Sequence, residues 1–118
     1  MAQPNILNLT VGRANTALQN VTNVVTNFLS NANASNKVIR VESILASNRQ
    51  NTVTDLSIEF VRGTLSYPIA PNVAVPDKST LYLLDKSSYI YLQEGDYLQC
   101  FSTTNNYINL IITYEEIS

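Results

Sequence analysis

The sequence predicts an all-β protein, an antiparallel β-sandwich of immunoglobulin-like or jelly-roll type with an N-terminal extended arm. Short runs of residues alternate between apolar and polar side chains, which is typical of strands with one buried face. Turn residues separate these runs at intervals of about 8–12 residues, the spacing found in sandwiches. No long helical pattern competes with these runs, so we expect about seven to nine short strands.

The N-terminal segment, residues 1–36, is rich in Asn and Thr and has a single charged side chain, Arg13. Its first dozen residues suit either a first strand or an extended arm that packs on another subunit, and the sequence leaves both open. Residues 18–29 contain apolar residues at helical spacing, but they are crowded with Val, Thr and Asn, which are poor helix formers. We therefore expect a strand rather than a helix there.

From Lys37 onward the alternation becomes regular. Ile39, Val41 and Leu45 are predicted to share the buried face of one strand, and the polar residues 46–51 are predicted to form a loop after it. A strand over residues 53–62 follows.

In this next strand Leu56, Ile58 and Phe60 are expected to point inward. The run that begins at Leu65 contains Pro68 and Pro71. Because proline cannot donate a hydrogen bond to a ladder, this run is predicted to be an edge strand.

The last part of the chain, residues 80–118, predicts four short strands. Each of the first three has a pair of residues predicted to face inward: Leu81 and Leu83, Ile90 and Leu92, Leu98 and Cys100. The turns between these three strands fall at residues 85–87 and 93–96. In the final strand the predicted inward residues are Ile108, Leu110, Ile112 and Tyr114. Ile111 is the one strongly apolar residue on the opposite face.

Length and composition bound the organisation of the protein. At 118 residues the chain is expected to be a single domain, with residues 1–36 as arm and first strand or strands and residues 37–118 as the sandwich core. The net charge is -2 and the cations are scattered, which argues against a nucleic-acid partner. We expect no membrane span and no signal peptide, and hence synthesis in the cytoplasm.

Residues that could perform chemistry are few. The chain has no histidine, which removes the usual general base and zinc ligand, and Cys100 is expected to be a small buried hydrophobe. Turn acids such as Asp85, Glu94 and Asp96 lack calcium-loop spacing and lie among lysines. We therefore expect no enzyme activity, no bound metal and no cofactor.

Exposed tyrosines mixed with Ser, Thr and Asn are typical of a polar, aromatic contact surface, and sugar stacking is the weaker alternative. The residues predicted to contact a partner are Ile6, Leu7, Leu9, Val11, Tyr89, Tyr91 and Tyr97.

Four stretches in order, residues 37–48, 75–81, 90–98 and 113–117, resemble small virion structural proteins of tailed bacteriophages, particularly those infecting cyanobacteria. The resemblance covers residues 37–118. It implies a non-enzymatic β-sandwich of the virion, most simply a homo-oligomeric cement or decoration protein that binds the major capsid protein on the capsid exterior. A neck, tail or fibre-attachment component of the virion and a carbohydrate-binding module are the alternatives.

Overall fold

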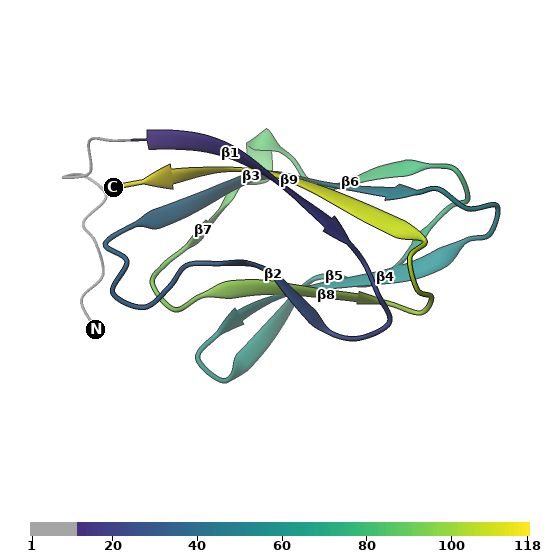
Figure 1. The fold of residues 1–118 in the computed structure, drawn as a ribbon, viewed down its shortest axis with the longest axis horizontal. Coiled ribbons are helices and arrows are strands. Elements are labelled where there is room, and N and C mark those ends of the chain that lie inside the picture. Colours follow the sequence, from purple (N-terminus) through teal and green to yellow (C-terminus); the bar gives the residue numbers. More distant parts are fainter. Residues whose placement is uncertain (1–11) are drawn as a thin grey trace.

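A computed structural model describes residues 12–118 and, for Lys86, the backbone alone. Within that range the chain forms nine β-strands and one 3₁₀ turn, arranged as two antiparallel sheets that face each other (Figure 1). The predicted all-β sandwich is therefore confirmed. Residues 18–29 contribute to two strands, as expected, and the proposed contact residues Ile6, Leu7, Leu9 and Val11 lie outside the described residues.

The first sheet, sheet A, has the strand order β1-β9-β3-β6. Its strands are β1 (Gly12–Asn20), β9 (Ile108–Ile117), β3 (Val38–Asn48), β6 (Thr80–Leu84) and the short β7 (Ile90–Leu92). β6 and β7 pair with successive parts of β3, and the 3₁₀ turn η2 (Lys86–Ser88) separates them. β6 and β7 therefore lie end to end along the same side of β3, and η2 interrupts this edge of the sheet between them.

The second sheet, sheet B, has the strand order β2-β8-β4-β5. Its strands are β2 (Thr26–Ser30), β8 (Tyr97–Ser102), β4 (Thr54–Arg62) and β5 (Leu65–Val75). β5 contains Pro68 and Pro71 and lies at the edge of the sheet, which confirms the position predicted from its prolines.

The strand pairs of the two sheets are nested in the sequence. β1 pairs with β9, β2 with β8, β3 with β6 and β7, and β4 with β5. The chain thus behaves as one long antiparallel ribbon that is rolled up, with alternate pairs placed in alternate sheets. This is the strand order of a jelly roll, one of the two sandwich types that the sequence predicted.

The core lies between the sheets and consists of the inward residues of both. Ile108, Leu110 and Ile112 of β9 are fully buried, as their alternation predicted, and so are Leu56 and Ile58 of β4. Burial of such a side chain stabilises the fold by about 1.5–3 kcal/mol.

Two details of β3 differ from the prediction. The pairing with β9 shifts between Val41 and Ser43, which leaves Glu42 as the extra residue of a β-bulge. Because a bulge reverses the alternation beyond it, Ile44 is fully buried and Leu45 is on the outer face, so the prediction that Leu45 points inward is wrong. The predicted loop at residues 46–51 was also placed too early, since β3 continues to Asn48.

Two buried asparagines close the ends of strands. Asn31, directly after β2, donates hydrogen bonds from Nδ2 to the carbonyl oxygens of Lys37 (2.8 Å) and Leu92 (3.0 Å). Asn48 donates in the same way to Thr52 (2.8 Å) and Val75 (3.1 Å). Each amide donates to two carbonyl groups from separate segments of the chain, which fixes the loop that follows.

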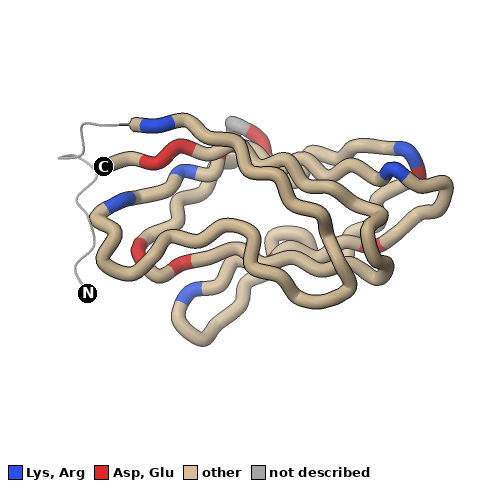
Figure 2. Tube along the Cα trace, viewed as in Figure 1, with Lys and Arg blue, Asp and Glu red and all other residues tan. Residues whose placement is uncertain are grey.

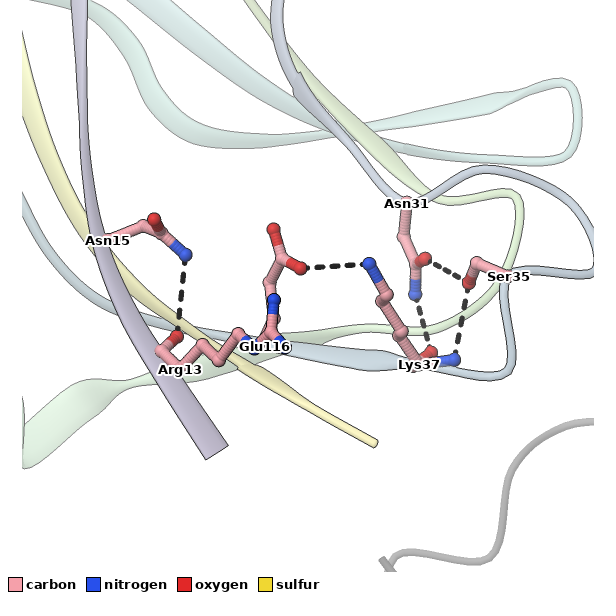
Figure 3. Close-up of polar contacts among 6 residues, drawn as sticks. All are labelled: Arg13, Asn15, Asn31, Ser35, Lys37 and Glu116. Carbon is pink, nitrogen blue, oxygen red and sulfur yellow. Dashed lines mark hydrogen bonds and ion pairs between the residues drawn. The ribbon is translucent and has the colours of Figure 1, made fainter. Parts of the chain in front are cut away.

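The loop after Asn31 is also joined to sheet A. The Lys37 ammonium group lies 3.0 Å from a carboxylate oxygen of Glu116 in β9 (Figure 3). Ser35 Oγ donates to Asn31 Oδ1 at 2.6 Å in the same view. This end of the sandwich is thus cross-linked by polar contacts between the loop and both sheets.

Candidate functional site

The outer face of sheet A carries a row of apolar side chains that crosses four strands. The register places Leu18 of β1 opposite Ile111 of β9, Ile111 opposite Leu45 of β3, and Leu45 opposite Tyr82 of β6. We call Leu18, Ile111, Leu45 and Tyr82 the apolar row. Residues opposite one another in a ladder point to the same face, so these four side chains are neighbours on the surface.

The apolar row is open to solvent at both ends. Leu18 is 76% exposed and Tyr82 is 71% exposed, while Ile111 is 37% exposed and Leu45 is half-buried. A single exposed apolar residue is ordinary, but a contiguous set on one face marks an interaction surface.

The neighbouring rows on this face are polar and uncharged. On one side the register aligns Asn20, Asn109, Ser47 and Thr80, and on the other Thr16, Thr113 and Ser43. The hydroxyl groups of Ser47 and Thr80 are 3.0 Å apart. Figure 2 shows that charged residues are sparse along the central strands and concentrate towards the ends of the molecule. An apolar strip bordered by hydroxyl and amide groups has the composition of a protein interface, from which charges are depleted.

A charged cluster borders this face near β7. Arg40 Nη2 lies 3.0 Å from a carboxylate oxygen of Glu42 and 3.3 Å from one of Glu115, and its guanidinium group lies 5.5 Å from the centre of the Tyr89 ring. The hydrogen bond to Glu42 is the main cause that raises the pKa of Arg40, with the charge of Glu115 adding to it and burial opposing both. One guanidinium group thus serves two carboxylates, so the cluster is acidic on balance.

The three tyrosines that the sequence proposed as contact residues do not form one patch. Tyr89 and Tyr91 are neighbours beside β3, with ring centres 5.5 Å apart and planes at 85°. Tyr97 is in β8, in the other sheet, opposite Val61. Perpendicular rings do not make a flat stacking platform, and Tyr89 and Tyr91 instead pack around Arg40.

The side chains that could take part in chemistry have structural roles. Burial raises the pKa of the Cys100 thiol to about 12, which keeps it in the unreactive neutral form. Hydrogen bonds from the Ser87 hydroxyl and backbone N–H lower the pKa of Asp85, the cap of η2. Among residues 12–118 no group of three or more Cys, Asp or Glu side chains is arranged to hold a metal ion. That part of the chain also contains no helix long and apolar enough to cross a membrane.

The apolar row was only partly visible in the sequence. The inward positions predicted for Leu81 and Leu83 imply that Tyr82 faces outward, and Ile111 is apolar on a polar face. Leu45, however, is predicted to be buried, and the sequence assigns no face to Leu18. The grouping depends on which residues are opposite one another in three strand pairs, which local alternation does not give.

Comparison of the chain with known proteins identifies no relative that could suggest a role for this surface. Neither the protein-family models nor the curated proteins contain a match to the chain.

Proposed function

We propose that this protein is a structural component of a tailed-phage virion, a cement or decoration protein that binds the head shell through the outer face of sheet A. The observation that carries the proposal is the apolar row, flanked by uncharged hydroxyl and amide groups. Such a face is suited to lasting contact with another protein surface. The phage setting itself rests on the resemblance of residues 37–118.

The fold is compatible with this role but does not decide it. Jelly rolls occur in viral capsid proteins and also in lectins, and fold alone does not assign function. The perpendicular arrangement of Tyr89 and Tyr91 makes sugar stacking the weaker alternative.

The size of the face favours binding in many copies. Four strand positions at about 4.8 Å and strands of about 30 Å give an area of about 600 Å². A stable protein contact buries about 800 Å² on each partner, so one such face gives a modest affinity on its own. Repetition around a symmetric shell, or links between copies, multiplies it through avidity.

Co-sedimentation with expanded, undecorated capsids tests the proposal. The wild-type chain should pellet with the capsids at a fixed stoichiometry. Tyr82→Glu should lose this binding, because it places a charge at the exposed end of the apolar row. Val53→Glu is the matched control: Val53 is 53% exposed and precedes β4, away from this face, so its binding should match the wild type.

Three results would contradict the proposal or redirect it. Equal binding by Tyr82→Glu and the wild type would remove the face of sheet A as the contact surface. Absence of wild-type binding, together with labelling of the neck or tail in a reconstructed particle, would favour the neck or tail alternative. Glycan-array binding that is lost in Tyr89→Ala would favour the carbohydrate-binding alternative.

A further inference from the structure

The edges of the two sheets differ in how open they are to another strand. β5 carries two prolines and two register shifts, β2 has five residues and one shift, and the edge made by β6 and β7 is divided by η2. β1 has none of these features: all nine of its residues pair with β9 in unbroken register. Natural sheets protect their edges with prolines, bulges or charges, so a long regular edge without them is a template for pairing.

The direction of the backbone groups of β1 follows from one hydrogen bond. The N–H of Val21 donates to the carbonyl oxygen of Ile108 at 2.9 Å, in register with the β1–β9 ladder. Because the bonds of an antiparallel ladder alternate, the odd-numbered residues of β1 bond to β9. The even-numbered residues therefore direct their N–H and C=O groups to the free edge: Ala14, Thr16, Leu18 and Asn20.

A second contact supports this alternation. The N–H of Arg49 donates to the carbonyl oxygen of Tyr107 at 3.1 Å, in register with the ladder between β3 and β9. Odd-numbered residues of β9 thus bond to β3, which leaves the even-numbered ones for β1. The free edge is also uncharged from Ala14 to Asn20.

Residues 1–11 have the sequence properties of a strand that could occupy this edge. They contain no charged side chain, and Leu7, Leu9 and Val11 alternate with Asn8 and Thr10. At about 3.4 Å per residue they reach about 37 Å, enough to cover the roughly 30 Å of β1. They join the described chain at Gly12, the first residue of β1.

We infer that residues 1–11 of one copy bind as an added strand to the free edge of β1 in a second copy. Main-chain hydrogen bonds to the edge-facing groups of Ala14, Thr16, Leu18 and Asn20 supply the affinity. The apolar side chains of the added strand supply the further contact. This rests on the proposed function, since it gives a repeated shell protein the link between copies that its modest face requires.

A second copy is favoured over the same chain as the source of the strand. To reach its own β1 edge, the segment would have to reverse direction just before Gly12. A two-residue hairpin turn at residues 10–11 or 11–12 would place Thr10 or Val11 at its first central position, which needs a positive φ angle that β-branched residues resist.

The first test is the mass of the full-length chain in solution by multi-angle light scattering or analytical ultracentrifugation. The wild type should exceed the monomer mass of 13.1 kDa at micromolar concentration. Thr16→Pro removes an edge-facing N–H and should give a monomer, while Thr16→Ala keeps this N–H and should assemble like the wild type. A monomeric wild type, or a folded Thr16→Pro variant that assembles like Thr16→Ala, would overturn the inference.

The second test identifies the strand and the chain that provides it. Leu9→Asp places a charge in the N-terminal segment and should also be monomeric. Mixing differently tagged Leu9→Asp and Thr16→Pro chains should restore a heterodimer, because one chain retains the segment and the other retains the edge. If each variant remains monomeric in the mixture, or if Leu9→Asp assembles normally, the inference fails.

A folding defect in Thr16→Pro would show in its circular dichroism spectrum, and Ala14→Pro, which removes another edge-facing N–H at an exposed position outside the apolar row, then takes its place in both tests. None of these measurements uses capsids. Loss of assembly between copies and loss of shell binding by Tyr82→Glu are therefore separate results.

Discussion

Arg62 and Asp96 form a two-pronged ion pair that joins the end of β4 to the turn between β7 and β8. Arg62 Nε lies 3.0 Å from Asp96 Oδ1, and Nη2 lies 2.7 Å from Oδ2. Asp96 is only 3% exposed and also accepts a hydrogen bond from the backbone N–H of Gln93 at 2.8 Å. The hydrogen bond to Asp96 is the main cause that raises the pKa of Arg62.

Replacing Arg62 should therefore destabilise the sandwich. Arg62→Ala leaves a buried carboxylate with one donor fewer, and we expect the free energy of unfolding to fall by about 1–3 kcal/mol. Lys37→Ala is the control, because its partner Glu116 is 26% exposed where Asp96 is buried, and exposed pairs contribute about 0–1 kcal/mol. Urea denaturation measures both. Equal losses in the two variants would show that the Arg62–Asp96 pair contributes no more to the free energy of unfolding than the exposed Lys37–Glu116 pair, despite the burial of Asp96.

The bulge at Glu42 makes a prediction about two adjacent residues of β3. Ile44→Ala should lower the free energy of unfolding by about 2–5 kcal/mol, because it leaves a cavity among fully buried side chains. Leu45→Ala should cost markedly less, since Leu45 is half-buried on the outer face. Urea denaturation of both variants is the check. A larger loss for Leu45→Ala would mean that the alternation runs through Glu42 without a bulge.

How much of the fold was predictable can be seen in these same strands. Alternation gave the buried faces of β9 and β4, and two prolines gave the edge position of β5, because each signal acts within a single strand. The bulge was hidden, since one inserted residue leaves a pattern that looks regular on both sides. The sequence predicts Asn48 to be a loop residue, but it ends β3, and its buried amide donates two hydrogen bonds there.

The candidate site was less predictable than the core for a physical reason. The residues of the apolar row are distant in sequence, and they become neighbours only through the registers of three strand pairs. Register is set by long-range pairing and bulges rather than by the composition of one strand. The free edge of β1 likewise follows from the strand order. Alternation within each strand does not fix that order, because several topologies have the same alternation.

The alternation of backbone groups in β1 predicts opposite outcomes for two neighbouring prolines. Ala17→Pro removes an N–H that is expected to donate to β9, which leaves a carbonyl of β9 without its donor, and should lower the free energy of unfolding by about 1–3 kcal/mol. Thr16→Pro removes an N–H that faces the free edge, so its loss should be clearly smaller. Denaturation at low protein concentration, where chains are separate, compares them. The reverse order of stability would place the free-edge groups on the odd-numbered residues.

The buried thiol of Cys100 predicts a loss of stability at alkaline pH. Its pKa is about 12 in the folded chain, against about 8.5 in an unfolded chain, so the unfolded state releases its proton first as pH rises. The thiol's contribution is fully present below pH 8.5 or so and declines above it, by up to about 1.4 kcal/mol per pH unit.

Urea denaturation from pH 8 to pH 10.5, with Cys100→Ala as the reference, isolates this contribution from the titration of tyrosine and lysine. The stability difference between wild type and Cys100→Ala should shrink as pH rises, because only the wild type carries the thiol. Thiol reagents should modify the native protein slowly and the urea-unfolded protein at once. Rapid labelling of the native chain, or a stability difference that does not change with pH, would show that Cys100 is accessible and ionises in the folded state.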